Sequence, residues 1–572
     1  MKASDFIALF LEEKGIKSVF ELSGGMITHL LDSLNQKTKI NIITMHHEQA
    51  AAFAADCYGR VTGIPGVALA TSGPGATNLL TGIGNAYFDS SPCIFITGQV
   101  NRHEQKKDRD IRQLGFQETD IVAMAKPITK ACFLVNEPSD IPAIFQKAFQ
   151  IATEGRPGPV LIDIPMDVQR QDIEYSISNI NNINNSSVSE IDIKKMEEAI
   201  KLAKKPLILA GGGIRASGSY ESFKTFLNQT KIPVITTLLA IDVIAFDDPL
   251  RVGFIGSYGN RWANIAFGES DLVIVLGSRL DIRQTGADTK FIENRKIFHI
   301  DCEKGEINNR ITGCIPILSD LKVFFNSFST YTNKNKVNFV KPATWIDSIN
   351  KLKIKWPDTK ELEPVGINPN SFMLHLSQAS KKAFAFTADV GSHQMWAAQS
   401  LRLNSDQLFL TSGGMGAMGF SLPGAIGACI ANQKKPVVVI VGDGCMQLNI
   451  QELQTIVRNK LPIKIVVMNN QTLGMIRQFQ DSYFESRYQS TYWGYDVPDF
   501  QKISQAYCID SMTIKEPSQV KNAVSWLWEN ENKPQLLQVM IDVHTNTYPK
   551  IAFGRPITDM EPFVKPIEME GT

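Results

Sequence analysis

Several features are scarce in this sequence, and each absence narrows the class of protein. Neither charge is in surplus, because 58 Lys and Arg residues balance 58 Asp and Glu residues without a basic block. Nucleic acid and membrane surfaces are therefore not expected partners. The eight cysteines form no CxxC pair and show no His/Cys ligand spacing, as is typical of reduced thiols in a cytoplasmic protein.

Long hydrophobic runs are also missing. No apolar run reaches the length of a membrane span. Residues 6–11 are apolar, but Glu12 and Glu13 follow at once and no small-residue cleavage site appears, which predicts an amphipathic first helix rather than a signal peptide. With 43% hydrophobic and 20% charged residues, the composition is that of a soluble globular protein.

The chain of 572 residues is too long for one hydrophobic core, so about three domains are expected. Two polar stretches, 172–192 and 327–340, hold few core-forming residues and are predicted as linkers. They divide the chain into an N-terminal domain at 1–170, a central domain at 190–325, a C-terminal domain at 340–550 and a tail at 551–572.

Short apolar strands alternate with segments of helical periodicity in all three pieces. We therefore expect an α/β fold with three doubly wound parallel-sheet domains. No fixed short period repeats, which excludes a solenoid. Ligands in such sheets bind beyond the carboxyl ends of the strands. The predicted strands are 18–22, 40–45, 66–70 and 92–97, then 206–210, 233–236, 271–276 and 297–301, then 383–387, 436–441 and 463–468.

One stretch of the C-terminal domain combines two strand ends with oxygen ligands. An apolar strand runs into Gly442-Asp443-Gly444, a helical segment follows, and the next strand ends at Asn469-Asn470. Because neighbouring parallel strands end at one edge of the sheet, Asp443 and Asn470, 27 residues apart, are expected side by side. A carboxylate, an amide oxygen and a backbone carbonyl suit Mg²⁺, and the helix N-terminus offers N–H groups to a phosphate. The alternative is a plain strand, turn and helix; GDG alone does not exclude it, but the Asn pair argues against it.

The same residues carry a resemblance. GDG followed by Asn-Asn at this spacing is similar to the cofactor motif of the thiamine diphosphate (ThDP)-dependent decarboxylases and carboligases. The segments HHEQAAAFAADCYGRVTGIPGVALATSGPGATN (46–78), SGGMGAMGFSLPGAIGA (412–428) and GCMQLNIQELQTIVRNKLPIKIVVMNNQTLGM (444–475) resemble acetolactate synthase catalytic subunits. The resemblance spans most of 1–550. It implies an enzyme that decarboxylates a 2-keto acid and joins the two-carbon unit to a carbonyl acceptor.

The resemblance assigns roles at ThDP. Glu48 matches a glutamate that hydrogen-bonds the aminopyrimidine and promotes ionisation of the thiazolium carbon. Met418 matches an apolar wedge that bends the cofactor, and the Gly416 carbonyl an acceptor for its amino group. His393 and Gln394 match positions that contact the diphosphate. Three of these residues also have plainer explanations. Glu48 fits a first-turn carboxylate that interacts with the helix dipole. Met418 fits an ordinary side chain that fills the core, and His393 fits a core histidine.

Further site residues follow from the resemblance. Gln117, with Phe116 beside it, matches a glutamine near the bound keto acid. Gly25 matches a backbone N–H that faces reaction intermediates, although the family's Tyr-Pro-Gly-Gly is Leu22-Ser23-Gly24-Gly25 here. The other implied ThDP contacts are Pro74, Asn78, Val390, Asp443, Gly444, Cys445, Asn470 and Met475, and the implied Mg²⁺ ligands are Asp443, Asn470 and Thr472.

A flavin site is expected in the central domain. Gly211-Gly212-Gly213 follows a strand, where backbone N–H groups can meet a pyrophosphate, although a sharp turn alone also explains the triplet. Together with ITTLLA (235–240), GSRLDIR (277–283), FHID (298–301) and SD (319–320), it resembles the FAD domain of acetolactate synthases, in which the flavin is structural. The alternative for Arg156, Arg279 and Arg283 is that they are solvated surface residues, which need no ligand to explain them. The implied FAD contacts are Arg156, Gly211, Gly212, Thr237, Leu238, Gly277, Arg279, Asp281, Arg283, Asp301 and Asp320.

Four activities fit these residues. The first is acetolactate synthase, in which pyruvate loses CO₂ and its two-carbon unit adds to a second 2-keto acid. The second transfers the same unit to another carbonyl, such as a keto nucleotide sugar. The third is a flavin-dependent pyruvate oxidase. The fourth, a cofactor-binding scaffold without turnover, is disfavoured because Glu48, Asp443 and Asn470 are all present.

Departures from the synthase pattern bear on the acceptor. Phe479 stands where the family has Trp, Met166 where it has Lys, and residues 548–560 differ from the usual ending. We expect weaker discrimination between acceptors and a reshaped cleft lid. The resemblance implies small-molecule 2-keto acids as partners. It also implies a homodimer or homotetramer in which Glu48 of one chain faces the metal site of another, and a regulatory subunit as a candidate partner.

Overall fold

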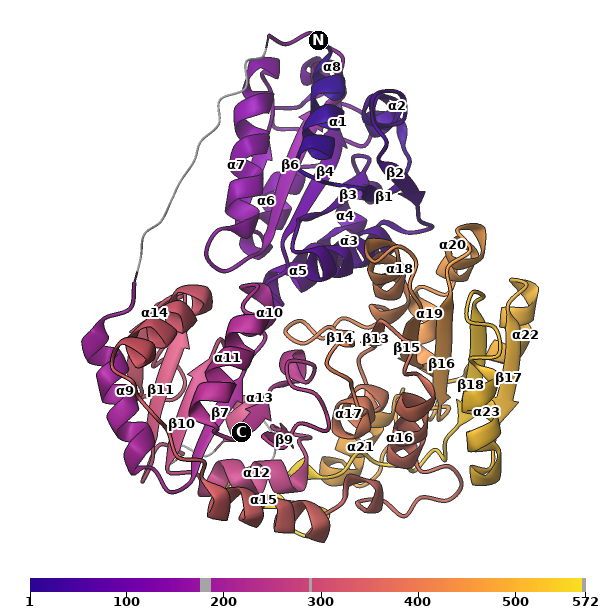
Figure 1. Ribbon diagram of the computed structural model, residues 1–572. Coiled ribbons are helices and arrows are strands. Elements are labelled where there is room, and N and C mark those ends of the chain that lie inside the picture. Colours follow the sequence, from indigo (N-terminus) through magenta and orange to yellow (C-terminus); the bar gives the residue numbers. More distant parts are fainter. Residues whose placement is uncertain (175–186, 288–290, 568–572) are drawn as a thin grey trace.

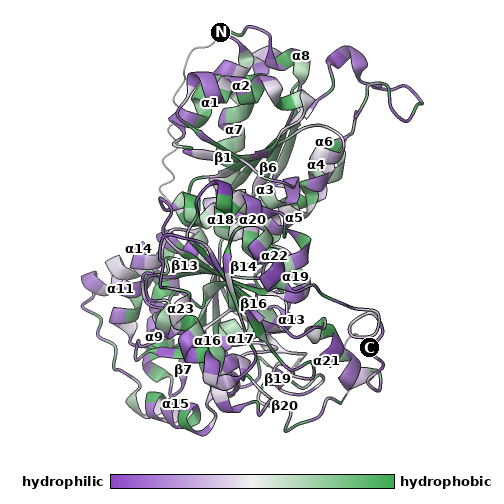
Figure 2. Ribbon diagram, turned by 90° about the vertical axis from the view of Figure 1, so that its right-hand side faces the viewer, coloured by the Kyte–Doolittle hydropathy of each residue, from purple (hydrophilic) through white to green (hydrophobic). Residues whose placement is uncertain are grey.

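The computed structural model describes residues 1–174, 187–287 and 291–567. Each third of the chain forms a six-stranded sheet with helices on both faces (Figure 1). Paired strands within these three sheets are parallel, so the predicted α/β class with three parallel-sheet domains is confirmed. Hydrophobic residues concentrate on the strands and hydrophilic residues on the outer faces of the covering helices (Figure 2).

The N-terminal sheet has the order β2-β1-β3-β4-β6-β5. Its strands are β1 (Ser18–Leu22), β2 (Asn41–Thr44), β3 (Gly66–Ala70), β4 (Cys93–Gln99), β5 (Ala131–Leu134) and β6 (Pro159–Pro165). Its helices are α1 (Ala3–Glu13), α2 (Thr28–Lys37), α3 (Glu48–Thr62), α4 (Pro74–Asn78), α5 (Leu80–Phe88), α6 (Ile121–Ala125), α7 (Ile141–Thr153) and α8 (Met166–Gln169).

The central sheet has the order β12-β11-β10-β7-β8-β9. Its strands are β7 (Pro206–Ala210), β8 (Val234–Thr236), β9 (Arg251–Phe254), β10 (Leu272–Leu276), β11 (Lys296–Asp301) and β12 (Ile315–Leu318). Its helices are α9 (Glu190–Leu202), α10 (Gly213–Ala216), α11 (Tyr220–Thr230), α12 (Arg261–Glu269), α13 (Ile282–Thr285), α14 (Leu321–Lys334) and α15 (Ala343–Lys355).

The C-terminal sheet has the order β14-β13-β15-β16-β18-β17, and a small hairpin, β19 (Lys550–Ile551) with β20 (Met560–Glu561), follows it. Its strands are β13 (Ala385–Ala388), β14 (Leu408–Thr411), β15 (Val437–Gly442), β16 (Ile463–Asn469), β17 (Asp510–Ile514) and β18 (Gln535–Met540). Its helices are α16 (Pro369–Ala379), α17 (Ser392–Ser400), α18 (Ser421–Ala431), α19 (Asp443–Leu448), α20 (Glu452–Arg458), α21 (Gly474–Tyr483), α22 (Phe500–Ala506) and α23 (Val520–Trp526).

The strand order of every sheet reverses at the first strand of its domain. The reversals lie between β1 and β3, between β7 and β10, and between β13 and β15. At such a switch point the loops after two neighbouring strands run to opposite sides of the sheet and leave a crevice at its carboxyl edge, where ligands bind. The topology therefore offers three crevices, one in each domain.

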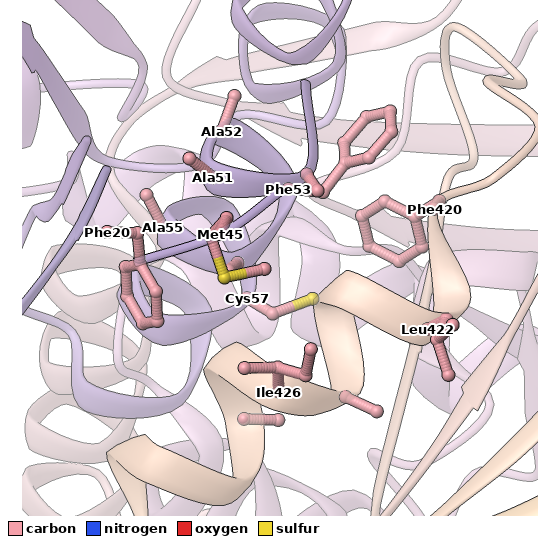
Figure 3. Close-up of a cluster of buried hydrophobic side chains, with 14 of the residues drawn as sticks. Phe20, Met45, Ala51, Ala52, Phe53, Ala55, Cys57, Phe420, Leu422 and Ile426 are labelled. Atoms are coloured by element: carbon pink, nitrogen blue, oxygen red, sulfur yellow. The ribbon is translucent and has the colours of Figure 1, made fainter. Parts of the chain in front are cut away.

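The N- and C-terminal domains share one hydrophobic core. Helices α3 and α18 pack so closely that a methyl group at Gly427 would lie 2.0 Å from the carbonyl oxygen of Ala54. Phe53 on α3 and Phe420 just before α18 meet edge to face, with ring centroids 5.4 Å apart (Figure 3). Because close-packed interiors tolerate little displacement, this contact fixes the two domains relative to each other.

The structure corrects details of the prediction. The linker expected at 327–340 is wrong in its first half, because α14 continues to Lys334 and buries Phe328 and Tyr331. Residues 175–186 of the other expected linker lie outside the described residues. The single helical segment expected after Asp443 is two helices, α19 and α20. A search of the described helices finds none with the length and apolar character of a membrane span.

Candidate active site

The switch point of the C-terminal sheet brings two loops together. His393 follows β13, and its Nε2 accepts a hydrogen bond at 3.2 Å from the N–H of Gly442 at the end of β15. A methyl group at Gly442 would lie 2.8 Å from the imidazole ring, so only glycine leaves room for it. Burial lowers the pKa of His393 to about 4, and the neutral ring can therefore act as this acceptor. His393 thus ties the floor of the crevice together.

Asp443 and Asn470 lie together above this floor, as the strand ends predict. Asp443 Oδ1 accepts hydrogen bonds from its neighbour Gly444 at 2.7 Å and from the hydroxyl of Tyr495 at 3.1 Å. Burial raises the pKa of Asp443 to about 6, while backbone N–H groups of the loop after β16 lower it. A methyl group at Gly474, the first residue of α21, would lie 2.6 Å from Asn470 Nδ2 and 3.1 Å from Ser392 Oγ.

These donors fit a hard cation. Asp443 Oδ2 is buried, and among the described residues it meets no hydrogen-bond partner; the same holds for Ser392 Oγ. A buried carboxylate oxygen without a partner is costly, and a divalent cation with oxygen ligands removes that cost. Thr472 donates its hydroxyl to the Thr491 carbonyl at 2.7 Å, which leaves the backbone carbonyl of Thr472 as its candidate ligand.

A second buried cluster of Asp389, His393 and Cys445 has metal-like donors but is occupied by protein contacts. Asp389 accepts hydrogen bonds from the backbone N–H groups of Gly419 at 2.9 Å and Ser421 at 2.8 Å. Cys445 donates to the Val390 carbonyl at 3.1 Å. These bonds hold the loop after β13 against the segment before α18, so the cluster is structural.

A glycine-rich segment between β14 and α18, residues 412–419, borders the same crevice; we call it the glycine loop. Met418 lies beside the GDG turn, because a methyl group at Gly444 would be 3.5 Å from Met418 Cε. Gly416 has a φ of 69°, a left-handed conformation that favours glycine. Gln394 donates to Thr411 Oγ1 at 2.6 Å and to the Ser412 carbonyl at 3.1 Å, so it holds the start of this loop.

The N-terminal domain brings a second set of predicted residues together. Glu48 is buried at the first turn of α3, and its Oε2 accepts a hydrogen bond from Asn78 Nδ2 at 2.9 Å. Asn78 ends the short helix α4, which begins at Pro74. A methyl group at Gly75 would lie 3.2 Å from Glu48 Oε1, so α4 passes close to the carboxylate.

Gln117 and Gly25 lie around the switch point of the same sheet. Gln117 has a φ of 67°, and its Cβ would be 2.9 Å from a methyl group at Gly73, just after β3. Gly25, just after β1, has open space around its Cα, whereas a methyl group at Gly24 would lie 2.5 Å from Thr71. The structure therefore gathers Gly25 and Gln117 at one crevice. The hydrogen bonds that the described residues make to the carboxylates of Glu48 and Asp443 all come from each residue's own domain.

The central switch point opens into a cavity of about 420 Å³, within the roughly 300–1,000 Å³ of cofactor sites. Gly211 lies outside the lining and packs on β10, where a methyl group would lie 2.1 Å from the Gly277 carbonyl oxygen. Val390, Gln394, Gly416 and Met475, predicted as ThDP contacts, line the same cavity. The predicted flavin contacts on its wall are Arg156, Gly212, Thr237, Leu238, Gly277, Arg279, Asp281, Arg283, Asp301 and Asp320.

Two arginines of the cavity wall are paired with carboxylates. Arg156 donates to Glu303 at 2.8 Å, to Glu306 at 2.9 Å and to Ser90 Oγ at 2.7 Å. Arg279 pairs with Asp281 at 3.0 Å. Arg283, Asp301 and Asp320 also line the cavity, so its wall combines charged and neutral surface.

Helix α21 carries Met475 and Phe479, and the chain end holds it in place. Gln478 exchanges two hydrogen bonds with the backbone of Thr547, at 2.8 and 3.0 Å. Arg261 on α12 donates to the carbonyls of Met560 and Glu561 at 3.3 and 3.0 Å. The segment from Tyr548 to Met560, expected to reshape a lid, thus begins beside α21 and ends on the central domain.

Two residues of the site were not predicted. Tyr495 binds Asp443 from a segment without a recognisable motif, so only tertiary structure reveals it. Ser392 follows β13, and its place beside a switch-point strand is a signal that could have indicated it.

Comparisons with known proteins agree with this geometry. Residues 1–124, 193–328 and 389–539 match the N-terminal TPP binding domain, the central domain and the C-terminal TPP binding domain of thiamine pyrophosphate enzymes. The acetolactate synthase large subunit of Lactococcus lactis subsp. lactis (strain IL1403) is 36% identical over 555 residues, which cover 96% of this chain and 94% of that protein. The large subunit of Cyanidium caldarium is 36% identical over 560 residues, covering 95% and 94%. The probable large subunit of Methanocaldococcus jannaschii is 36% identical over 583 residues, covering 100% and 96%. Three matched domains and this identity over nearly the whole chain confirm the resemblance: the chain belongs to the thiamine pyrophosphate enzymes, in the family of acetolactate synthase large subunits.

Proposed function

We propose that this ThDP-dependent carboligase decarboxylates pyruvate and transfers the two-carbon unit to a second 2-keto acid, as an acetolactate synthase does. The observation that carries the proposal is the presence in one chain of both halves of the site. Glu48 is hydrogen-bonded to Asn78, and Asp443 Oδ2, which meets no hydrogen-bond partner among the described residues, lies in the loop cluster that holds Asn470. The relatives named acetolactate synthase support the same activity.

Glu48 is the proposed proton-handling group. ThDP, when bound, supplies a thiazolium carbon that acts as a nucleophile toward a keto group and as an electron sink for the loss of CO₂. Asn78 fixes one oxygen of the Glu48 carboxylate, and the other accepts no hydrogen bond from the described residues. That oxygen is available to hold a proton at the aminopyrimidine. Gly416 would accept the amino group at its carbonyl, and Met418 would set the bend of the cofactor.

Asp443, Asn470 and the Thr472 carbonyl are the proposed Mg²⁺ ligands, with the diphosphate of ThDP completing the shell. The lack of a hydrogen-bond partner for Asp443 Oδ2 within the described part of the chain supports this assignment. Bound Mg²⁺ would also keep Asp443 ionised although burial raises its pKa to about 6. His393 would act indirectly in this scheme, because its Nε2 is already used to hold Gly442.

A second copy of the chain is proposed to complete the site, in a homodimer or homotetramer. Glu48 and Asp443 each take their hydrogen bonds within their own domains in the described chain, so Glu48 of one copy would face Asp443 of another. The relatives are named large subunits, and a regulatory subunit is the corresponding candidate partner for this chain.

FAD is the proposed ligand of the central cavity. The cavity lies at a topological switch point, and its volume suits a cofactor. Gly212 and Gly213 line the cavity, and Gly211 and Gly213 pack against Gly277, so the turn after β7 can come close to a pyrophosphate. Carboligation transfers no electrons overall, so FAD is proposed to be structural.

The acceptor pocket is proposed to include Phe479. Its ring lies 4.7 Å from that of Tyr483 and 5.8 Å from that of Phe484, so an aromatic cluster fixes its orientation. A larger indole at this position would reach further from α21. A smaller ring leaves more room for the acceptor and should discriminate less between homologous keto acids.

Product analysis tests the proposal. The purified chain with ThDP, Mg²⁺ and FAD is incubated anaerobically with pyruvate alone, with pyruvate and 2-ketobutyrate, and with pyruvate and a keto nucleotide sugar. We expect CO₂ and acetolactate in equal amounts from pyruvate alone, and no bleaching of the flavin. Acetate formed in step with flavin reduction would contradict the proposal and indicate an oxidase. A product made only with the keto sugar would move the acceptor to another class.

A further inference from the structure

A buried ionic network joins the N-terminal domain to the back of the glycine loop. Asp89, the residue after α5, accepts hydrogen bonds from the Gly413 N–H at 3.0 Å and the Gly414 N–H at 2.6 Å. Arg60 on α3 donates to Asp89 at 3.0 Å and to the Thr411 carbonyl at 2.8 Å. One carboxylate and one guanidinium of the N-terminal domain therefore bind three backbone positions of the C-terminal domain, those of Thr411, Gly413 and Gly414.

A second layer supports the first. Asp56 accepts from Arg60 Nε at 2.6 Å and from Asn85 Nδ2 at 2.6 Å. Asn85 accepts the hydroxyl proton of Ser412 at 2.5 Å, and Ser412 Oγ accepts from the N–H of Ala417 at 2.8 Å. The network thus reaches from α3 and α5 to both ends of the glycine loop.

A buried ionic network of this kind adds little to the net free energy of folding. The side chains of Asp56 and Asp89 are fully buried and that of Arg60 nearly so. Burial raises the pKa of Asp89, and Arg60 opposes that rise. Desolvation of buried ion pairs commonly cancels their attraction, and such pairs are better suited to specify one geometry.

The glycine loop needs an imposed geometry. Four of its eight residues are glycine, so the chain loses much conformational entropy when it becomes ordered. Behind the loop there is no spare room: a methyl group at Gly414 would lie 2.8 Å from Phe88 Cβ, and one at Gly413 would lie 2.7 Å from Leu239. Its other side lines the central cavity. The contacts behind the loop therefore set its position.

We propose that Asp89 is a positioning residue for ThDP, which fixes the glycine loop so that Gly416 and Met418 meet the cofactor. The inference rests on the proposed function, because Gly416 and Met418 are cofactor contacts only there. The next residue, Ser90, accepts a hydrogen bond from Arg156 at 2.7 Å, and both residues line the central cavity. The same turn thus positions both the glycine loop and the flavin cavity.

Three variants of the full-length protein test this. Asp89→Asn keeps the shape but places an NH₂ group among N–H donors. Gly414→Ala leaves every charge in place and inserts a methyl group between the loop and Phe88. Asp271→Asn is the matched control, because Asp271 also accepts hydrogen bonds from two consecutive backbone N–H groups, those of Lys204 at 2.8 Å and Lys205 at 2.9 Å. It precedes β10, at the end of that strand away from the cavity. The readouts are thermal unfolding, the ThDP dissociation constant with saturating Mg²⁺, and the near-ultraviolet circular dichroism of bound ThDP.

We expect Asp89→Asn to weaken ThDP binding about ten- to a hundredfold, the range for loss of one or two charge-assisted hydrogen bonds, and to change the dichroism of bound ThDP. Gly414→Ala should reproduce both effects, and the double variant should show less than the sum of the two. Asp271→Asn should lower stability alone. If Asp89→Asn does not fold, Gly414→Ala decides the test.

Two results would overturn the inference. One is ThDP affinity and dichroism like those of wild type in both Asp89→Asn and Gly414→Ala. The other is the same loss of ThDP binding in Asp271→Asn. Wild type that binds ThDP but forms no acetolactate would refute the proposed function and leave this comparison valid.

Discussion

Gly211→Ala is expected to force apart two strands of the central domain. The new methyl group would lie 2.1 Å from the Gly277 carbonyl oxygen and 2.6 Å from Ser278 Cβ. Ordinary contacts are longer by more than an ångström, and the obstacle is backbone rather than a flexible side chain. β7 and β10 are paired in register up to Ala210 and Leu276, so the strain falls where the proposed flavin cavity begins.

The size of the effect follows from these contacts. Overpacking of a close-packed site costs about 1–3 kcal/mol, and a rigid obstacle places this variant near the upper end, about 3 kcal/mol. Each kcal/mol lowers the Tm of a domain of this size by about 2–4 °C, so a fall of roughly 6–12 °C is expected. Retained flavin per protein should fall as well, because Gly212 and Gly277 move with the distorted turn.

Two other glycines of the central domain serve for comparison. The nearest contacts of a methyl group at Gly212 would be with Leu239, the closest at 3.2 Å from its Cβ, and one at Gly305 would meet nothing within 4 Å. We expect Gly212→Ala to lower the Tm less than Gly211→Ala does, and Gly305→Ala to leave both the Tm and the flavin content unchanged. Thermal unfolding followed by circular dichroism and the flavin absorbance of the purified protein are the measurements. If Gly211→Ala has the same Tm as Gly305→Ala, the packing argument is wrong. If Gly211→Ala has a lower Tm but an unchanged flavin content, the link between this packing and the cavity is wrong.

Three further outcomes are expected. Glu48→Gln should lower carboligation by about 10²–10⁴ in rate while ThDP stays bound, as measured by acetolactate formation and cofactor titration; near-normal turnover would contradict the role of Glu48. Asp443→Ala should lose tight ThDP binding and its Mg²⁺ dependence together, because one oxygen ligand serves both; titration of ThDP with Mg²⁺ and with EDTA checks this, and equal affinity in both would count against the site. Phe479→Trp should raise the preference for 2-ketobutyrate over pyruvate by about 10–200-fold at most, in competition assays; an unchanged ratio would remove Phe479 from the acceptor pocket.

The sequence predicted best those strands that are mostly apolar runs. The bounds of β1, β3 and β7 agree with the prediction, and these strands are buried along nearly their whole length. Of the six edge strands of the three described sheets, only β2 was predicted; β5 and β17 are only partly buried, so their residues lack a continuous apolar run. The buried interior strands β6 and β18 were missed as well, because β6 is bounded by prolines and β18 contains two glutamines.

The proximity of candidate site residues was predictable where chemistry and strand ends coincide. Asp443 and Asn470 follow adjacent strands, so topology alone places them together. Asp89 gives no such signal, because a carboxylate after a helix resembles an ordinary capping or surface residue. Its partners Gly413 and Gly414 lie more than 300 residues further along the chain. Only the packing of α3 and α5 on the C-terminal domain reveals the contact.

The three switch points share one packing feature. At each, a glycine at one strand end leaves room for the loop after the neighbouring strand. A methyl group at Gly24 would lie 2.5 Å from Thr71, one at Gly211 would lie 2.1 Å from Gly277, and one at Gly442 would lie 2.8 Å from His393. Loops that diverge at a switch point would otherwise leave an open gap between the strands. The close contact closes that gap, so each crevice has a defined floor, and the two residues proposed to act on ThDP, Glu48 and Asp443, each begin a helix that follows a strand of these sheets.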